Sequence, residues 1–337
     1  MFTLAEIILR MISKEIRQVI TKPFRRPRLL VIGDAMIDRY IWGSAKRLSP
    51  EAPVPVVDVK EETGTPGGAA NVVQNLCKLN ATVSLCAVVG DDPAGNELVE
   101  QLKDENIDTE AVITDESRPT TVKTRVMAGS HQLLRLDKES TSYISKEVEE
   151  KLFSAVEKKI AAADMVLLSD YNKGLLSESF SQKVIALCNK KKKKVAIDPK
   201  GLNYEKYTGA WLIKPNKREL AEAANLEAIE NTDALIAAAR KVIAKTKSKY
   251  MVVTRSEEGL ALVSKNTFNN FPVKATEVYD VTGAGDTVFA SLGYFLSLGL
   301  DLKTACELAN YAAAIAVRRV GSVAVTVDEI LSFLPKK

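Results

Sequence analysis

Short apolar runs alternate with amphipathic segments along most of the chain. The apolar runs predict parallel strands buried on both faces, at Leu29–Asp34, Thr82–Gly90, Met165–Asp170, Val195–Asp198, Trp211–Asn216 and Tyr250–Arg255. Apolar positions at helical spacing predict helices over Gly67–Leu79, Ala94–Glu105, Lys146–Ala162, Ser177–Lys190, Gly283–Leu298 and Leu302–Val320, with two more before Tyr250. Strands that alternate with helices predict an α/β fold, a doubly wound and mostly parallel sheet with helices on both faces.

Another set of segments alternates apolar and polar positions, as strands with one exposed face do. These segments are Tyr40–Ser44, Val54–Lys60 and part of Thr120–Leu136. They do not fit a sheet that helices cover on both faces. They therefore predict a small β lid, formed by about residues 40–60 and 120–136, that projects from the main domain.

The first 27 residues precede this pattern and predict an N-terminal amphipathic helical extension, so that the main domain spans residues 28–337. Glu6, Arg10 and Lys14 interrupt its apolar positions, and the segment is too charged to cross a membrane. It also lacks the uninterrupted apolar core of a signal peptide. Two interpretations remain: a helix that packs on the domain or on a partner, and a helix that lies on a membrane surface.

Composition narrows the class of protein. The 337 residues are 46% apolar and 27% charged, which is typical of a folded domain and excludes a disordered chain or a disulfide scaffold. A net charge of +4 is too small to predict a nucleic-acid or membrane partner, and the run Lys190–Lys194 is interpreted as the cap of a helix. Four cysteines without CxxC spacing indicate reduced thiols and a cytoplasmic protein. The single histidine, His131, excludes a histidine-based catalytic triad.

The sequence DVTGAGDT (Asp280–Thr287) precedes a long predicted helix. Its two glycines let the backbone approach a ligand closely, and N–H groups at a helix N-terminus form an anion hole for a transferring phosphoryl group. Asp286 lies in the same turn, where a carboxylate can accept the proton of an attacking hydroxyl. The alternative interpretation is a helix cap with glycines for tight packing.

A second glycine motif, GTPGGAANVVQNL (Gly64–Leu76), opens an earlier predicted helix. A glycine pair followed by Asn71 permits close approach to a polyhydroxyl ligand, because the asparagine amide both donates and accepts hydrogen bonds. On its own the motif is weak, since glycine is common where loops meet helices. It is not a dinucleotide-binding fingerprint, and the chain has no GxxxxGK[ST] loop.

Together the two glycine motifs resemble those of the ribokinase-like (PfkB) sugar kinases, and the resemblance spans about Arg28 to Leu334. Further segments resemble the D-glycero-β-D-manno-heptose-7-phosphate kinases, which form one half of the bifunctional heptose kinase/adenylyltransferases. They are IGDAMIDRYIWGSAKRLSPEAPVPVV (Ile32–Val57), LLRLDKE (Leu133–Glu139), LSDYNKGLL (Leu168–Leu176), DPKG (Asp198–Gly201) and KPNKREL (Lys214–Leu220). That subfamily usually reads NLSE where this chain has NKRE (Asn216–Glu219). The HxGH motif of the adenylyltransferase half does not occur in this sequence, which implies a separate adenylyltransferase in the pathway.

The resemblance implies nucleotide-side roles for residues that match the family's motifs. Asp286 matches the catalytic base. The anion hole matches Thr282, Gly283, Ala284 and Gly285. The pair near the nucleotide phosphates and Mg²⁺ matches Asn216 and Glu219, with Glu219 acting on the metal through water. Thr254, Ser256 and Gly259 follow a predicted strand and border the ATP.

The resemblance also implies a sugar pocket built from several motifs. Asp34 and Asp38 match acceptors of sugar hydroxyl groups, and the remaining residues of the pocket are Gly67, Gly68, Asn71, Arg135 and Asp170. Lys173 and Lys200 follow strand ends, where open α/β sheets bind ligands, and a substrate that already carries a phosphate needs such cations. The alternatives are solvated loop carboxylates for the two aspartates and surface positions for the two lysines.

The implied function is that of an ATP- and Mg²⁺-dependent sugar kinase. It would phosphorylate the C1 hydroxyl of D-glycero-β-D-manno-heptose 7-phosphate to the 1,7-bisphosphate, a step in the synthesis of ADP-heptose for the lipopolysaccharide core. Two lids commonly pair in this family, which implies a homodimer through the lid. The alternatives are another ribokinase-like kinase, for a different sugar phosphate or a nucleoside, and a sugar-phosphate sensor that has the fold without turnover.

Overall fold

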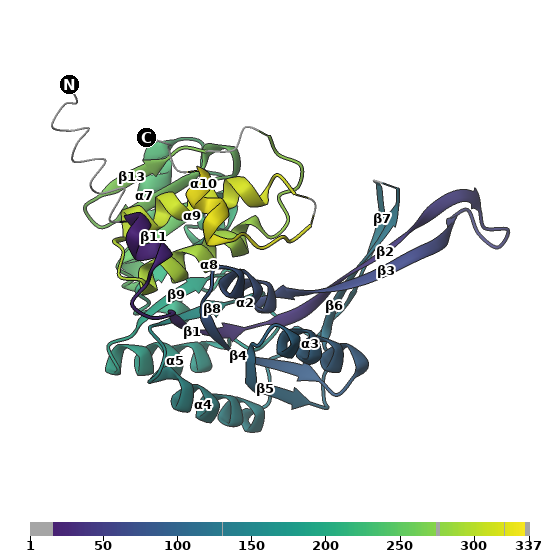
Figure 1. Ribbon diagram of the computed structural model, residues 1–337, viewed down its shortest axis with the longest axis horizontal. Helices are drawn as coiled ribbons and strands as arrows, with labels where there is room; N and C mark the ends of the chain where they lie inside the picture. Colours follow the sequence, from purple (N-terminus) through teal and green to yellow (C-terminus); the bar gives the residue numbers. More distant parts are fainter. Residues whose placement is uncertain (1–15, 130, 274–276, 320, 334–337) are drawn as a thin grey trace.

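A nine-stranded sheet forms the centre of the molecule (Figure 1). The computed structural model describes residues 16–129, 131–273, 277–319 and 321–333. The strand order is β13-β12-β11-β10-β9-β8-β1-β4-β5; β11 to β5 run parallel, and β12 and β13 are antiparallel at one edge. The strands are β1 (Arg28–Gly33), β4 (Thr82–Gly90), β5 (Asp108–Asp115), β8 (Met165–Ser169), β9 (Lys194–Asp198), β10 (Leu212–Ile213), β11 (Tyr250–Thr254), β12 (Leu260–Ser264) and β13 (Phe268–Phe271).

Helices cover both faces of this sheet, as the alternating sequence pattern predicts. One face carries α2 (Ala69–Lys78), α3 (Pro93–Asp104), α8 (Ala284–Ser297), α9 (Leu302–Ala316) and α10 (Val327–Phe333). The other carries α4 (Lys146–Ile160), α5 (Glu178–Lys190), α6 (Lys217–Ala223) and α7 (Thr232–Thr246). Short 3₁₀ turns lie at Tyr204–Tyr207 and Ser256–Glu258. The predicted α/β class and the two helical layers are confirmed.

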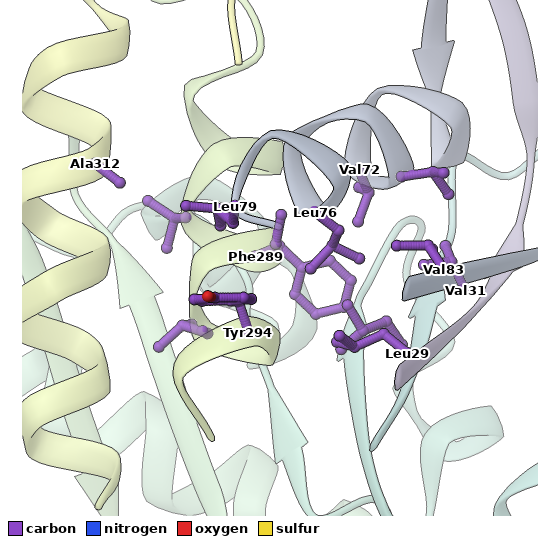
Figure 2. Packing of buried hydrophobic residues seen from close by; sticks show 14 of the residues in the cluster. Leu29, Val31, Val72, Leu76, Leu79, Val83, Phe289, Tyr294 and Ala312 are labelled. Atoms are coloured by element: carbon purple, nitrogen blue, oxygen red, sulfur yellow. The ribbon is translucent and has the colours of Figure 1, made fainter. Parts of the chain in front are cut away.

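The two faces of β1 separate the core into two apolar clusters. Successive strand residues point to opposite faces, so Leu29 and Val31 belong to one cluster and Leu30 and Ile32 to the other. Figure 2 shows Leu29 and Val31 beside the ring of Phe289, which α8 contributes. This packing fixes α8 against β1, and the N-terminus of α8 is the part of the molecule that carries the strongest sequence motif.

A second sheet of four strands extends away from the core and forms the lid (Figure 1). Its order is β3-β2-β6-β7, with β2 (Ala35–Leu48), β3 (Pro55–Gly68), β6 (Thr121–Ala128) and β7 (His131–Lys138). β2 pairs parallel to β6 and antiparallel to β3. Asp34 alone separates β1 of the core from β2 of the lid.

Several element boundaries differ from the predictions. The lid strands begin closer to the core than residue 40, and the glycine pair Gly67–Gly68 ends β3 instead of opening α2. Gly68 pairs with Ala35 and Gly67 with Met36, so tertiary pairing decides the state of both glycines. The predicted strand Trp211–Asn216 is only Leu212–Ile213, and β5, β12, β13 and α10 were not predicted.

The predicted N-terminal extension lies mostly outside the described residues. Residues 16–21 are helical, and Ile20 is buried in the same apolar cluster as Leu29. Arg25 forms an ion pair with Asp164, which ties the segment after this helix to the end of the loop before β8. Within the ranges that the structure describes, no helix is both long enough and apolar enough to cross a membrane.

Candidate active site

The N-terminus of α8 places the carboxylate of Asp286 at the centre of the site. Gly283 caps the helix with φ +74°, a conformation that favours glycine, and a Cβ there would lie 2.8 Å from Ser322 Oγ and 3.2 Å from Asn71 Nδ2. Gly285, two residues after Gly283, is exposed, while Asp286 is buried. The first N–H groups of an α-helix have no partner within it, so this turn offers donors to an anion.

Asp280 organises the segment in front of this helix. Its Oδ1 accepts hydrogen bonds from the backbone N–H (2.9 Å) and the hydroxyl (2.6 Å) of Thr282, and its Oδ2 accepts one from the N–H of Gly321 (2.8 Å). Burial alone would raise the pKa of Asp280, but these hydrogen bonds lower it below its ordinary value. The hydroxyl of Thr282 therefore supports the glycine turn from within.

Two side chains from distant elements hold the carboxylate of Asp286. The Tyr171 hydroxyl, from the loop after β8, donates to Oδ1 at 2.7 Å, and the Asn71 amide, from α2, donates to Oδ2 at 2.6 Å. Burial raises the pKa of Asp286, while Tyr171, Asn71 and the charge of Lys214 act in the opposite direction. A buried carboxylate with a raised pKa is suited to accept a proton from a hydroxyl group.

The amide of Asn71 is itself fixed by a buried network. Asn75 Nδ2 donates to Asn71 Oδ1 at 3.1 Å, and the Thr287 hydroxyl donates to Asn75 Oδ1 at 3.0 Å. The network therefore connects α2 with α8, the two helices that carry the two glycine motifs. It also orients Asn71 so that its NH₂ group faces Asp286.

Asp38 lies at the base of the lid with Arg125 as its partner. Arg125 Nη1, from β6, donates to Asp38 Oδ1 at 2.6 Å, and its guanidinium lies 5.2 Å from the centre of the Tyr40 ring. The absence of a side chain at Gly67 makes room for Asp38, since a Cβ there would be 2.3 Å from Asp38 Oδ2. Gly68 has φ +57°, and a Cβ there would be 2.5 Å from the carbonyl oxygen of Asp34.

Asp34 is buried and holds the loop that follows β8. Its carboxylate accepts hydrogen bonds from the backbone N–H groups of Tyr171 (2.9 Å), Lys173 (3.0 Å) and Leu175 (3.3 Å). Burial and the nearby charge of Asp170 raise the pKa of Asp34 to about 6, although these hydrogen bonds oppose the change. These bonds give Asp34 a positioning role, and its contact with a sugar hydroxyl stays a prediction.

Asp170 likewise turns into the protein. Its carboxylate accepts two hydrogen bonds, one from Lys206 Nζ at 2.5 Å and one from the Tyr207 hydroxyl at 2.7 Å. Both donors are buried. Tyr207 also accepts a hydrogen bond from the N–H of Lys200 at 3.2 Å. Asp170 thus fixes the loops after β8 and β9, where the candidate ligand residues lie.

An apolar pocket of about 440 Å³ lies beside the glycine turn. Its walls include Val273, Val281, Val288 and other apolar side chains, and its rim includes the predicted nucleotide residues Asn216, Thr254, Ser256, Gly259, Ala284 and Gly285. Mostly apolar walls with a few polar groups fit a flat, heteroaromatic base that carries phosphates. The structure therefore brings the predicted nucleotide residues together.

A smaller pocket of about 180 Å³ continues from it toward Asp286. It shares Asn216, Thr254 and Gly285 with the apolar pocket and adds Asp198, Lys200, Lys214, Glu219 and Tyr171. Lys214 is buried and forms an ion pair with Asp198 at 2.9 Å. Burial raises the pKa of Asp198 to about 7, with the charges of Asp286 and Glu219 acting in the same direction and Lys214 opposing them.

Asn216 and Glu219 form the N-terminal cap of α6. The N–H of Glu219 donates to Asn216 Oδ1 at 2.8 Å, and the N–H of Asn216 donates to Glu219 Oε2 at 2.9 Å. Lys200 Nζ donates to the other oxygen, Glu219 Oε1, at 2.8 Å. This reciprocal cap gives Asn216 and Glu219 a structural role that does not depend on the two residues between them, Lys217 and Arg218, where the heptose kinases usually have Leu and Ser.

The donor set of the small pocket fits Mg²⁺ held with a nucleotide. The described residues contain no group of three or more His, Cys, Asp or Glu side chains arranged for a metal ion. Mg²⁺ needs no such cluster, because it keeps several waters and binds through one or two carboxylates plus substrate phosphates. Asp198 and Glu219 line the pocket and supply carboxylates of that kind.

The predicted sugar residues do not all meet at Asp286. Asn71 contacts it directly, and Asp38 lies at the lid base beside Gly67. Arg135 lies on the exposed strand β7 and pairs with Asp137, and Lys173 pairs with Glu139 at 2.7 Å. The two predicted phosphate-binding lysines are thus separated: Lys200 lies in the small pocket beside Glu219, and Lys173 does not line it.

Sequence reasoning assigned no role to Tyr171, Arg125, Asp198 or Lys214. Three of them stand inside quoted motifs: Tyr171 in LSDYNKGLL, Asp198 in DPKG and Lys214 in KPNKREL. An aromatic hydroxyl directly after a strand-end aspartate was the available signal for Tyr171. Arg125 carries no local signal, because its partner Asp38 is 87 residues away in sequence.

Comparison with known proteins gives a family match and full-length structural neighbours. Residues 26–329 match the pfkB family carbohydrate kinase. The Bifunctional protein HldE of Helicobacter hepaticus is 46% identical over 310 residues, which cover 92% of this chain and 64% of that protein. The Bifunctional protein HldE of Wolinella succinogenes is 46% identical over 310 residues, covering 92% and 65%. The chain thus spans just under two thirds of the length of these relatives.

Solved structures share the fold at low sequence identity. The Arabidopsis thaliana ribokinase, solved with ribose and ATP, has a TM-score of 0.74 and 20% identity, and the match covers 93% of this chain and 100% of that one. Phosphofructokinase-2 of Escherichia coli, solved with potassium, has a TM-score of 0.75 and 18% identity, covering 91% and 97%. These neighbours have the same sheet architecture along nearly the whole chain.

Proposed function

The chain belongs to the pfkB family of carbohydrate kinases, and we propose that it transfers the γ-phosphoryl group of ATP to the anomeric hydroxyl of D-glycero-β-D-manno-heptose 7-phosphate. The observation that carries the proposal is the position of Asp286. Its carboxylate lies in the first turn of α8, lines the small pocket that continues from the apolar pocket, and accepts hydrogen bonds from Asn71 and Tyr171. The match to proteins named Bifunctional protein HldE agrees with the heptose-kinase segments, one of which contains Tyr171, a hydrogen-bond donor to that carboxylate.

The chain's own residues supply positioning, charge and a proton acceptor. Asn216, Thr254 and the apolar walls hold the nucleotide so that its terminal phosphate reaches the N–H groups of Gly283 and Gly285. The acceptor hydroxyl gives its proton to Asp286 while its oxygen bonds to the γ-phosphorus and the bond to the ADP oxygen breaks. Lys214 lies close to Gly285, 3.8 Å from where a Cβ there would be, and adds positive charge at the transferring group.

Mg²⁺ would be held by the nucleotide phosphates together with Asp198 and Glu219, the latter through water. When bound, the ion neutralises the charge of the phosphates. The lid excludes water from the reacting groups, since water would otherwise compete with the sugar for the phosphoryl group.

We place the substrate's own phosphate at the lid base, where Lys173 follows β8. Arg118 fixes the backbone there by donating to the carbonyl oxygens of Ser140 and Lys173. Lys200 was predicted to serve the same phosphate, but its contact with Glu219 favours the ATP phosphates instead. In this proposal Lys173 binds the phosphate of the sugar, and Lys200 binds the phosphates of ATP.

The lid also supports the proposed homodimer. Every residue of β7 is exposed, and Leu133, Leu134 and Leu136 are 38%, 46% and 55% exposed. An exposed edge strand with apolar side chains tends to pair with another chain, and we propose that the lid of a second copy of this protein covers β7.

The experiment that tests the function is a panel of acceptors assayed for ATP-dependent release of ADP. The panel contains the heptose 7-phosphate, the unphosphorylated heptose, other sugar phosphates and nucleosides. We expect the heptose 7-phosphate to have the highest kcat/KM, and the Asp286→Asn variant serves as the inactive control. A preference for a nucleoside or another sugar phosphate would move the chain to a different kinase of the family, and binding without ADP release would make it a sensor.

A further inference from the structure

The Tyr171 hydroxyl stands on the side of the base that opens to the small pocket. Tyr171 and Asp286 both line that pocket, and Tyr171 is half-buried. Asn71, which donates to the other carboxylate oxygen, is 2% exposed and does not line it. Of the two oxygens of Asp286, the one bound to Tyr171 is therefore the one that faces the reacting groups.

An acceptor hydroxyl has to meet the same oxygen. A general base works within hydrogen-bond distance of the proton that it takes, about 2.6–3.2 Å between heavy atoms. The Tyr171 hydroxyl already lies 2.7 Å from Oδ1. It thus has the distance, the donor character and the direction that an acceptor hydroxyl would have.

We propose that Tyr171 is a positioning residue that occupies Asp286 until the sugar hydroxyl replaces it, and so prevents the base from activating water while only ATP is bound. This inference rests on the proposed function, because it takes Asp286 as the base. Without Tyr171, a water molecule could give its proton to Asp286 while its oxygen bonds to the γ-phosphorus. The bond to the ADP oxygen would break, and the products would be ADP and phosphate.

The loop that carries Tyr171 is fixed at both ends. Asp34 accepts from the N–H of Tyr171 itself and from Lys173 and Leu175. The side chain of Asp170, the preceding residue, is held by the buried Lys206 and Tyr207. The backbone of this loop is therefore fixed, and rotation of the Tyr171 side chain alone would release Asp286 to the sugar hydroxyl.

The charges around Asp286 keep Tyr171 a donor. Burial and the charges of Asp286 and Asp198 raise the pKa of Tyr171 well above its ordinary value, so its hydroxyl stays protonated. The other groups that face Asp286 are Asn71 from α2, Asp38 from β2 and Lys214 after β10. Of these groups and Tyr171, Asn71 and Tyr171 donate a hydrogen bond to the carboxylate of Asp286.

The test is the Tyr171→Phe variant, assayed with Mg²⁺ and ATP alone and then with the heptose 7-phosphate. We expect ATP hydrolysis without sugar to rise about tenfold relative to sugar phosphorylation. We also expect the acidic limb of the kcat/KM profile to move up by about one pH unit, because the charged form of Asp286 loses a donor. Tyr204→Phe is the matched control, since its buried hydroxyl has no hydrogen-bond partner among the described residues and both readouts should stay unchanged.

Tyr171→Leu is a second variant in case the first does not fold, and unfolding temperature and ATP affinity are measured for both. The same rise in hydrolysis is expected from either. An unchanged ratio and an unchanged pH limb in a folded variant would overturn the role of Tyr171 while leaving the kinase function intact. A wild-type protein that phosphorylates no sugar phosphate would overturn the proposed function instead.

Discussion

Asp286 works under opposing influences, because burial raises its pKa while two donors and Lys214 lower it. The Asp286→Asn variant should lose about 10²–10⁴-fold in kcat, since it removes the proton acceptor and keeps the size of the side chain. Tyr171 and Asn71 donate to different oxygens of Asp286, and an asparagine has an NH₂ group in place of one of them, so one of the two hydrogen bonds is lost. ATP binding should change little, because Asp286 does not line the apolar pocket proposed for the nucleotide base. Steady-state kinetics and calorimetry check the two parts, and a variant that keeps a tenth of the rate would exclude Asp286 as the base.

The two lysines make separable predictions. Lys173→Ala should reduce kcat/KM for the heptose 7-phosphate by about 10–150-fold, the value of a charge-assisted hydrogen bond, and should hardly affect the slower unphosphorylated heptose. Lys200→Ala should raise the KM for ATP and affect both acceptors equally, because Lys200 pairs with Glu219 in the nucleotide half. Kinetics with both acceptors and both variants form the measurement. If Lys173→Ala lowers kcat/KM equally for both acceptors, the sugar phosphate does not bind at the lid base.

At the scale of elements, the hairpin β2–β3 has room only for glycine at position 67, which can be tested. A methyl group there would lie 2.3 Å from Asp38 Oδ2 and displace that carboxylate from Arg125. Gly67→Ala should therefore raise the KM for the sugar about tenfold or more while leaving the KM for ATP unchanged. Gly129→Ala is the lid control, because alanine is strained there at φ +59° while a Cβ meets none of the described atoms within 4 Å, so it reports backbone strain in the lid without a clash at Asp38. If Gly129→Ala raises the sugar KM equally, general damage to the lid explains the effect.

The strands that the sequence predicts best are those buried on both faces. β1, β8 and β9 read as continuous apolar runs because helices cover both of their faces. β5 was missed because DTEAVITD is an edge strand with polar residues at both ends. The Gly67–Gly68 pair was assigned to a helix because glycine before an amphipathic run is typical of a helix start, whereas its state is decided by Ala35 and Met36 across the ladder.

The candidate site was predictable where the chemistry lies within one motif. Asp286 and the glycine turn form a local unit, and so do Asn216 and Glu219 as a helix cap. Tyr171 and Asp286 are 115 residues apart, and their contact exists only because β8 and α8 pack together. No spacing rule reports such a pair, so the donor to the base had to come from the structure.

At the scale of the whole molecule, the buried carboxylate of Asp34 and the partly buried one of Asp198 link stability to pH. The pKa of Asp34 is about 6 and that of Asp198 about 7, both raised from 3.8 mainly by burial. Between pH 4 and 7 the folded protein therefore holds more protons than the unfolded chain, so these groups lower stability as pH rises through that window. Without ligands, the protein should unfold about 2 °C or more higher at pH 5.5 than at pH 7.5.

Thermal unfolding across this range measures the effect. Combining Asp198→Asn with Lys214→Met removes the Asp198 contribution together with its buried partner, so the slope should become shallower. A stability that rises steadily from pH 5.5 to 7.5 would contradict both raised pKa values. Ion-paired carboxylates such as Asp164, whose pKa is lowered, lose their contribution only at more acidic pH.

Removal of residues 1–23 tests whether the N-terminal segment serves stability or catalysis. Ile20 is 3% exposed in the core cluster, and burial of such a side chain contributes about 1.5–3 kcal/mol. We expect the truncated protein to unfold at lower temperature and to keep its kcat, because β1 and Asp34 remain. Calorimetry and the ADP-release assay give the two values. A folded truncation without activity would show that the segment takes part in the reaction.

The hairpin β2–β3 leaves the core and returns to it at neighbouring points, since the N–H of Ala69 donates to the carbonyl of Asp34 at 3.0 Å. A segment whose two ends meet can change its length and sequence without altering the path of the chain on either side. Residues 35–68 are therefore one excursion from the core, tied to the rest of the protein by the buried Met36 and Ile37 and by the ladder of Met36–Gly43 with β6, and it can vary beyond these contacts. During evolution, a descendant could gain a new sugar specificity by altering this one stretch, while the phosphoryl-transfer machinery in the C-terminal half passes on unchanged.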